Sequence, residues 1–239
     1  MSDKNNKVKY NLKNAHYALL TVGEDGEVSY AAPVPLPGSV SLSLDANGEP
    51  ENFYADGIAY YVINNNMGYD GDLELALIPE SFRTDVLREK LDAKGVLIEN
   101  SDAELALFAL LFEFDGDVRH IRHVMYNCSA SRPKIEGKTN EEKKEVQTET
   151  LTIKATPLSD GKVKAKTGNT TDATVYADWY KSVYLSAADP SIPDNPEEWL
   201  DEFNTFSIYQ VLPKLIELWG MNIRTDVEAK KNFMQQTVK

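Results

Sequence analysis

The side chains of this sequence best suited to metal binding or nucleophilic catalysis are His16, His120, His123 and Cys128. His120 and His123 belong to a segment, 118–130, whose apolar residues alternate as in a strand. Side chains three apart on a strand point to opposite faces, so these histidines are not expected to share a metal. By the same parity Cys128 points away from His123, which leaves no Cys–His pair for catalysis. We predict that Cys128 is a buried structural thiol.

Two further motifs resemble ligand-binding loops but lack a required residue. Gly137-Lys138-Thr139 ends like a phosphate-binding loop, yet Arg132 stands where the first glycine must be. The segment 66–72 has the glycine of a calcium loop, but its twelfth position is Leu77 and not glutamate. Several carboxylates occur in Asp-Gly turns, where backbone geometry explains them. We therefore expect no catalytic residue, no metal, no cofactor and no enzymatic activity.

Composition excludes several classes of protein. The chain has 239 residues, with 25 Lys and Arg against 38 Asp and Glu, and a formal charge of −13. A sequence-reading nucleic-acid binder needs a basic face to neutralise phosphates, which this balance does not favour. One cysteine excludes an intrachain disulfide, and no apolar run approaches the roughly 18 residues of a membrane-spanning helix. The polar N-terminus lacks the apolar core of a secretory signal, so we expect synthesis in the cytosol and no membrane partner.

From Tyr10 to about Lys166 the pattern is that of an antiparallel β protein, because acidic glycine turns separate short apolar or alternating runs. These turns are Glu24-Asp25-Gly26, Asn47-Gly48, Asp56-Gly57, Asp70-Gly71, Asp115-Gly116 and Asp160-Gly161. Strands are predicted at 18–22, 28–31, 39–44, 53–62, 73–78, 118–130 and 148–155. Leu73, Leu75 and Leu77 are expected on one face of their strand.

Three segments depart from this alternation. The spacing of Phe82, Val86 or Leu87, and Leu91 predicts a helix over about 80–92, lying against one face of a sandwich. The run 105–114 is apolar on both strand faces, so it is either a central strand or one covered by another subunit. The stretch 132–147 is polar and charged, and a loop of this length between two strands is often functional.

After residue 187 the composition changes from β to helical. A proline-containing linker, 188–196, separates a β domain, 1–187, from a helical segment, 197–239. Helical spacing places three apolar residues on one face and four on another, as candidates for docking on a partner or on the β domain itself. These residues are Trp199, Phe203 and Phe206, and then Ile208, Leu212, Leu215 and Trp219.

Several segments carry a resemblance to a known family. They include Phe53-Tyr54-Ala55-Asp56-Gly57, Gly68-Tyr69-Asp70-Gly71-Asp72-Leu73-Glu74, Pro79-Glu80-Ser81-Phe82-Arg83-Thr84-Asp85, His123-Val124-Met125-Tyr126-Asn127-Cys128 and Glu136-Gly137-Lys138-Thr139. Read together, they resemble the major tail protein, or tail tube protein, of long non-contractile tailed phages and prophages of Gram-positive bacteria. The resemblance covers about residues 7–185, and 147–152 and 180–185 are similar to that family's closing pattern.

The resemblance implies a mainly β fold: a tail-tube-type β-sandwich with one flanking α-helix. It also implies self-association into homo-hexameric rings, stacked into a tube through which genomic DNA passes without sequence-specific binding. Such a protein is located in the virion tail and assembles in the host cytoplasm. In the family, loops and termini join one ring to the next. Carried over by position, the loop 132–147 is a candidate for that role, with Arg132, Lys134, Glu136 and Lys138 as its inter-ring residues.

The C-terminal part departs from the tube family. Residues 195–239, above all Glu198-Trp199-Leu200-Asp201-Glu202-Phe203, resemble the end of a phage tail assembly chaperone, joined to the tube subunit either naturally or by design. An unassembled tube subunit exposes strand edges and apolar patches, which favour premature polymerisation. We hypothesise that 197–220 cover such a surface and keep the chain monomeric or in a limited oligomer. Deleting 190–239 is then expected to promote rings, tubes or aggregates.

Two other functions compete with the tube. A carbohydrate-binding or adhesion-type β-sandwich of a phage particle is favoured by an exposed aromatic platform, and an enzyme would need a pair of close acids that the sequence does not place.

The excess of acidic residues is also consistent with a tube that conducts DNA. A negatively charged wall repels phosphates and lets DNA slide, so acidic residues of the barrel strands are expected to face the lumen.

Overall fold

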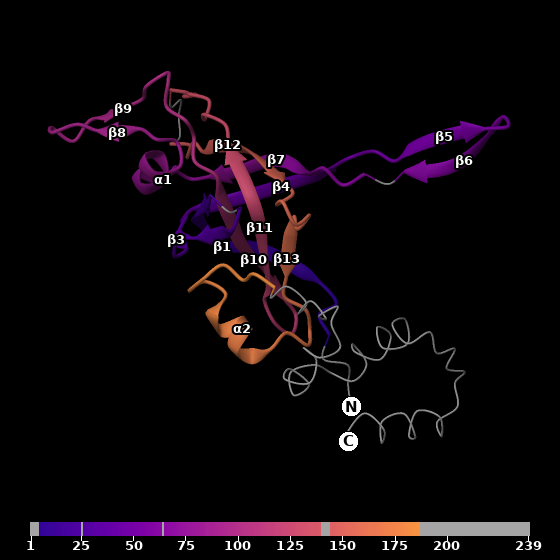
Figure 1. The fold of residues 1–239 in the computed structure, drawn as a ribbon. Coiled ribbons are helices and arrows are strands. Elements are labelled where there is room, and N and C mark those ends of the chain that lie inside the picture. The colour runs from indigo at the N-terminus through magenta and orange to yellow at the C-terminus, as the bar shows by residue number, and fades with distance from the viewer. Residues whose placement is uncertain (1–4, 25, 64, 140–143, 187–239) are drawn as a thin grey trace, which may run out of the picture. The chain divides into compact units, whose positions relative to one another are not determined.

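The computed structural model describes residues 5–24, 26–63, 65–139 and 144–186 (Figure 1). These residues belong almost entirely to one unit, Met1–Tyr184. The described chain is mainly β with two short helices, which confirms the predicted fold class. The predicted linker and helical segment, 188–239, lie outside the described residues.

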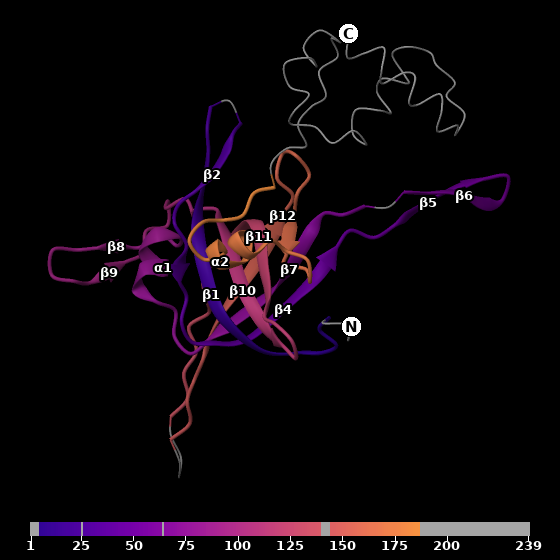
Figure 2. The ribbon, with the colours of Figure 1, turned by 90° about the horizontal axis from the view of Figure 1, so that it is seen from below.

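A large antiparallel sheet organises the unit, in the order β2-β1-β10-β11-β12-β7-β4, with β13 paired to β11 and β3 paired to β1 (Figures 1 and 2). Its strands are β1 (Lys9–Val22), β2 (Val28–Tyr30), β3 (Val34–Pro35), β4 (Ser39–Asn47), β7 (Gly68–Leu75), β10 (Phe108–Gly116), β11 (Ile121–Ala130), β12 (Glu149–Thr156) and β13 (Lys164–Lys166). Two small hairpins lie outside it, β5 (Glu51–Ala55) with β6 (Ile58–Ile63), and β8 (Lys90–Leu91) with β9 (Leu97–Ile98).

The doubly apolar run of the sequence is the central strand β10, which pairs with β1 on one side and β11 on the other. Phe108, Leu110 and Phe112 point into a large core, and Ala109 and Leu111 point into a smaller one on the opposite face. All five are buried within this single chain. The central-strand alternative is therefore confirmed, and no second subunit is needed to cover this strand.

The large core is covered by the helix α1 (Glu80–Asp85). Tyr17, Phe82 and Phe108 form an edge-to-face row with ring centroids 5.1 and 5.5 Å apart, a geometry that aromatic pairs prefer. The predicted helix over 80–92 begins correctly but is too long. The backbone leaves the helix after Asp85, Arg88 has a positive φ of 59°, and the chain turns into β8.

The smaller core is covered by a second helix that the sequence did not predict, α2 (Ala173–Asp178), and by the residues after it. Trp179 is buried there, and its indole nitrogen donates to the carbonyl of His123 at 3.4 Å. Asp172 caps α2 by accepting hydrogen bonds from the backbone N–H groups of Thr174 and Val175. The β-sheet thus has one short helix on each of its two cores.

Two predicted strands differ in the structure. The strand expected at 53–62 is instead a hairpin, because Asp56 and Gly57 both take positive φ angles and reverse the chain between β5 and β6. The strand expected at 73–78 ends at Leu75. Leu77 is 67% exposed and does not share the buried face with Leu73 and Leu75.

The hairpin β5–β6, which we call the arm, extends the β4–β7 pair beyond the sheet (Figures 1 and 2). The β4–β7 ladder continues as far as Asn47 opposite Gly68, and the N–H of Met67 still donates to the carbonyl of Asn47 at 2.9 Å. Gly48 and Gly68 stand at the base of the arm with φ angles of 114° and 103°. No described helix is long and apolar enough to cross a membrane.

Gly68 lets the base of the arm pass against β12, and its replacement tests that packing. A Cβ atom at Gly68 would lie 1.9 Å from the carbonyl oxygen of Ala155, in addition to the strain of its positive φ. We expect Gly68→Ala to lower the free energy of unfolding in urea by at least about 3 kcal/mol.

The matched control is Gly26→Ala, because Gly26 also has a positive φ but nothing within 4 Å of an added Cβ. That substitution should cost only about 1 kcal/mol from backbone strain. Equal losses in the two variants would show that backbone conformation alone, and not contact with β12, fixes the base of the arm.

Candidate assembly surfaces and a buried polar network

The residues best suited to chemistry are held in packing roles. Cys128 is fully buried, as predicted, and burial raises the pKa of its thiol to about 12. The ring of His123 stacks on Phe112 with centroids 5.0 Å apart. Burial, with nearby lysines adding to it, lowers the pKa of His123 to about 4. A protonated thiol and a neutral, stacked imidazole offer no activated nucleophile.

The predicted parity between His123 and Cys128 is wrong. The ladder between β10 and β11 shifts register, so that Met125 pairs with Leu110 while Cys128 pairs with Phe108. This bulge returns Cys128 to the large core, the same side on which His123 packs. Their partners lie four residues apart on β10, so the two side chains do not form a catalytic pair. His120 lies just before β11 and pairs with Asp115 instead, at 2.6 Å.

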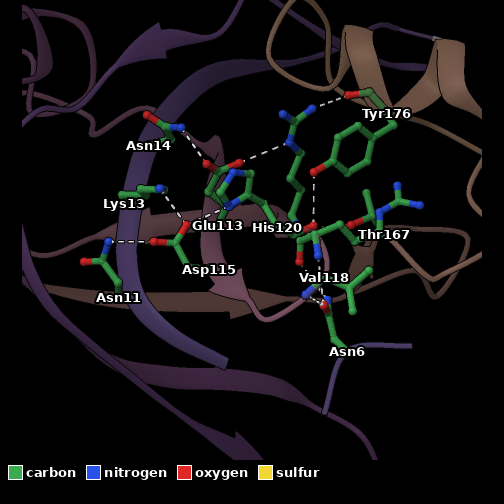
Figure 3. A network of polar contacts seen from close by, with 12 residues as sticks. Asn6, Asn11, Lys13, Asn14, Glu113, Asp115, Val118, His120, Thr167 and Tyr176 are labelled. Carbon is green, nitrogen blue, oxygen red and sulfur yellow. Dashed lines mark hydrogen bonds and ion pairs between the residues drawn. The ribbon is translucent and has the colours of Figure 1, made fainter. Parts of the chain in front are cut away.

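A buried carboxylate holds the α2 segment to the sheet (Figure 3). Glu113 is 1% exposed and accepts from the amide of Asn14 at 2.6 Å, from Nε of Arg122 at 3.1 Å and from the hydroxyl of Tyr180 at 3.2 Å. Arg122 stacks on the ring of Tyr176 at 3.9 Å and donates to its carbonyl. These partners, from β1, from β11 and from the segment after α2, satisfy the buried carboxylate together.

Burial raises the pKa of Tyr180 well above its usual value, and the neighbouring charge of Glu113 adds to the shift. The phenol therefore stays protonated and remains a donor to the carboxylate. The donors and acceptors of this network are paired with one another, so its role is structural. We call Asn14, Glu113, Arg122, Tyr176 and Tyr180 the clamp.

A second polar group at the same end of β10 fixes the turn that follows it (Figure 3). The side chain of Asn6 accepts from the N–H groups of Val118 and Arg119 and donates to the carbonyl of Arg119. Asp115 pairs with Lys13 at 2.6 Å, and hydrogen bonds from Lys13 and Asn11 lower the pKa of Asp115. In the described part of the chain, no group of three or more His, Cys, Asp or Glu side chains is arranged to hold a metal ion.

Most of the exposed aromatic side chains of the described chain lie on the arm. Phe53, Tyr54, Tyr60 and Tyr61 are between 58% and 68% exposed. Ile58, Val62 and Ile63 are exposed as well. A two-stranded hairpin has no core of its own and is marginal in water, so a surface of this kind is typical of a contact with another molecule.

The sequence did not identify the arm as a functional element, because the pattern of 53–62 predicts one alternating strand. The Asp56-Gly57 turn inside that run was the feature that indicated a hairpin. Aromatic or β-branched residues also stand at successive positions from 60 to 63, which a strand with one face in water does not require.

The four inter-ring candidates of the loop 132–147 do not form one cluster. Arg132 is tied to the β9–β10 connection, pairing with Glu99 at 2.8 Å and donating to the carbonyl of Asn100 at 3.2 Å. Lys134 pairs with Glu136, and this hydrogen bond lowers the pKa of the carboxyl.

Lys138 is linked to the other limb of the loop, since its N–H and carbonyl both bond the side chain of Gln147. The described limbs, 131–139 and 144–148, contain no helix or strand. The inter-ring role of this loop stays a prediction. The helical docking candidates Trp199, Phe203, Phe206, Ile208, Leu212, Leu215 and Trp219 lie outside the described residues.

The outward face of β4, β7 and β12 carries an acidic surface. Three cross-strand rows place residues of the three strands side by side: Ser41, Glu74 and Thr150; Ser43, Asp72 and Thr152; and Asp45, Asp70 and Lys154. We call these nine residues the acidic face. Hydroxyl groups donate to its carboxylates, as from Thr152 to Asp72 at 2.8 Å and from Ser41 to Glu74 at 2.8 Å.

Hydrogen bonds from Thr148 and Ser41 lower the pKa of Glu74, so it remains charged near neutral pH. Beside this face runs an edge strand. Within the described chain β4 forms a ladder with β7 only, so its other edge has no ladder partner among the described strands.

No family model matches the sequence, and no curated protein matches it. Two cryo-EM structures show weak structural similarity. One is the cap of the anti-feeding prophage, a tube-terminating cap, with 9% identity, a TM-score of 0.36 and alignment over 67% of this chain and 93% of that one. The other is a sheath/tube terminator of an extracellular contractile injection system, with 7% identity, a TM-score of 0.34 and alignment over 65% and 94%. Similarity at this level does not establish a shared family.

The clamp predicts unequal losses of stability among its members. Glu113→Ala leaves the half-buried Arg122 without its ion-pair partner, so we expect the free energy of unfolding to fall by about 3 kcal/mol. Tyr180→Phe removes one hydrogen bond to a charged group and should cost about 1.5–3 kcal/mol. Urea unfolding monitored by tryptophan fluorescence measures both.

The control for the clamp is Glu99→Gln, which breaks the exposed pair with Arg132 and should cost less than about 1 kcal/mol. If Glu113→Ala were as mild as this control, the carboxylate would not hold α2 to the sheet.

His123 predicts a pH dependence with a definite sign. Its pKa in the folded state, about 4, lies below the ordinary value of 6.5, so between these values the unfolded chain binds more protons than the folded one. His123 should therefore cost stability as the pH falls from about 6.5 towards 4, by up to about 3 kcal/mol. Urea unfolding of the wild type and of His123→Phe at pH 7 and pH 4.5 isolates this contribution, and identical pH profiles would contradict it.

Proposed function

We propose that this chain is a non-enzymatic structural subunit of a phage tail tube, which associates with itself into stacked hexameric rings that enclose a DNA conduit. The observation that carries the proposal is the acidic face beside the free edge of β4. Pairing of that edge with a neighbouring subunit would continue the sheet, and repetition around a ring would close it without exposed edges. The resemblance of residues 7–185 to tail tube proteins supports the same role.

The acidic face suits the wall of such a conduit. Asp45, Asp70, Asp72 and Glu74 carry four negative charges against the single Lys154, and neighbouring serine and threonine hydroxyls keep the surface polar. A wall of this kind repels phosphates, and its hydroxyl groups add no fixed positive charge that would retain DNA. In this proposal the acidic face lines the lumen. The assembled protein is located in the virion tail.

The C-terminal segment remains part of the proposal as an assembly chaperone-like element. The described unit has a free strand edge and an exposed apolar arm, both of which favour uncontrolled association. Residues 197–220, with their Trp and Phe positions, are suited to cover such a surface until assembly begins.

A second function is favoured by one observation. The aromatic side chains of the arm resemble the exposed platform that a carbohydrate-binding or adhesion module requires. The arm, however, also exposes Ile58, Val62 and Ile63, and aliphatic side chains of this kind are typical of contacts between proteins. The tube is therefore the better-supported function.

Negative-stain electron microscopy and sedimentation velocity test the proposal on the full chain and on a chain ending at residue 189. We expect the shortened chain to form rings or tubes, and the full chain to remain monomeric or in small oligomers. Removing only 225–239, the polar end, is the control and should leave the assembly state of the full chain unchanged.

Monodisperse monomers for both the full and the shortened chain, at every concentration tested, would contradict the tube. Binding of a soluble glycan to such monomers, lost in Tyr54→Ala and Tyr61→Ala, would support the adhesion module instead.

A further inference from the structure

Positive and negative charges are divided unevenly along this chain. Residues 14–82 contain eleven Asp and Glu residues and no lysine or arginine, so all 25 cationic residues lie outside this stretch. The stretch includes β4, the arm and β7. One part of the folded unit is therefore strongly acidic, while β1 at its start, β11 and β13 supply the cations. A chain with this division is complementary to another copy of itself.

The arm combines acidic and apolar side chains. Phe53 pairs across the hairpin with Tyr61, and Glu51 pairs with Ile63, so these four side chains share one face. Glu49 stands before β5 and Asp56 stands in the tip, both exposed. Figures 1 and 2 show the arm directed away from the large sheet, so β5 and β6 do not pack on that sheet.

A complementary surface lies around His123, where the large core reaches the solvent. Lys166 is the cross-strand partner of His123, and Lys164, two residues earlier, lies on the same face of β13. Lys9 on β1 places its ammonium group 4.6 Å from the centre of the Phe114 ring, and Phe114 meets His123 edge to face at 5.6 Å. We call these five residues the socket.

The socket gathers cations that are not neutralised within the described chain. Its three ammonium groups act together on one imidazole, lowering the pKa of His123 in addition to burial. Lys164 donates to the hydroxyl of Tyr69 and lies 4.2 Å from the centre of that ring. Among the described residues, none of the three lysines takes part in a salt bridge.

We infer that the socket receives the arm of a second copy of this chain, with Glu49 and Glu51 of the arm meeting Lys164 and Lys166. Aromatic rings on both sides offer their faces to one another and to the lysines, a contact that such rings favour. The contact is heterologous, because arm and socket are different surfaces, and it can therefore continue around a ring or along a stack. The inference rests on the proposed tube function and names the partner surface within it.

A second copy fits the socket better than a nucleic acid does. The socket has three cations beside an apolar edge, whereas a duplex presents a row of phosphates that needs a longer basic track. The arm, in contrast, supplies carboxylates and uncovered aromatic side chains together. Charge and apolar complementarity are then satisfied by the same element.

Charge reversal with rescue tests the inference in the full-length chain. The socket variant is Lys164→Glu with Lys166→Glu, the arm variant is Glu49→Lys with Glu51→Lys, and the third variant combines all four changes. Sedimentation equilibrium at low and high salt measures the association constant of each. We expect each double variant to associate at least tenfold more weakly than the wild type, and the combined variant to recover to within about threefold, since the charges are again complementary.

The matched control is Lys94→Glu with Lys181→Glu, which makes the same change of net charge on exposed lysines outside the socket and should leave association unchanged. Wild-type association that neither double variant weakens overturns the socket while the tube proposal stands. Loss of binding to a short DNA duplex in the socket variant, with self-association intact, assigns the socket to nucleic acid and also overturns the inference.

Directed cross-linking gives a second measurement that does not depend on strong association. A Glu51→Cys chain mixed with a Lys166→Cys chain should form a disulfide-linked heterodimer under mild oxidation, and Cys128 is too deeply buried to compete. Two chains carrying Glu99→Cys and Lys181→Cys serve as the control pair. Absence of the arm–socket heterodimer, or equal yields from both pairs, overturns the inference, whereas the tube is judged separately by the microscopy of the shortened chain.

Discussion

The structure depends on covering both faces of one strand. β10 is apolar on each side, so a single layer on one face would leave the other in water. The rest of the sheet and α1 cover one face of this strand, and α2 and Trp179 cover the other. Glu113 and Arg122 then fasten the returning segment, and the buried carboxylate is tolerated because three donors reach it.

Both hydrophobic cores are covered within the chain itself. The segments that project from the sheet are therefore not needed to cover them. The arm, the β8–β9 hairpin and the loop between β11 and β12 contribute little to either core. Their apolar side chains, such as Phe53, Leu91 and Ile135, are exposed. A self-sufficient body with uncovered projections is the construction expected of a subunit that folds first and assembles afterwards.

The sequence predicted the features that depend on local pattern. The mainly β class, the central-strand alternative for 105–114, the buried Cys128 and the start of the helix at Glu80 all follow from periodicity and burial. The end of that helix was wrong, because Leu91 fits both a helical and a strand pattern and only the backbone at Arg88 decides between them. The bulge in β11 has no signature in single-residue parity, and it moved Cys128 to the other face.

The clamp could have been noticed, since Glu113 is the only charged residue in an apolar run. Its partners Asn14, Arg122 and Tyr180 are distant in sequence, so only the fold brings them together. The arm and the loop 132–147 share exposure but differ in their internal order, for β5 and β6 are already hydrogen-bonded to each other. A preformed hairpin loses less conformational freedom on docking than an irregular loop does. In the assembly we propose, contacts through the arm would therefore need less binding energy to become stable than contacts through the loop, which favours the arm as the first point of attachment between subunits.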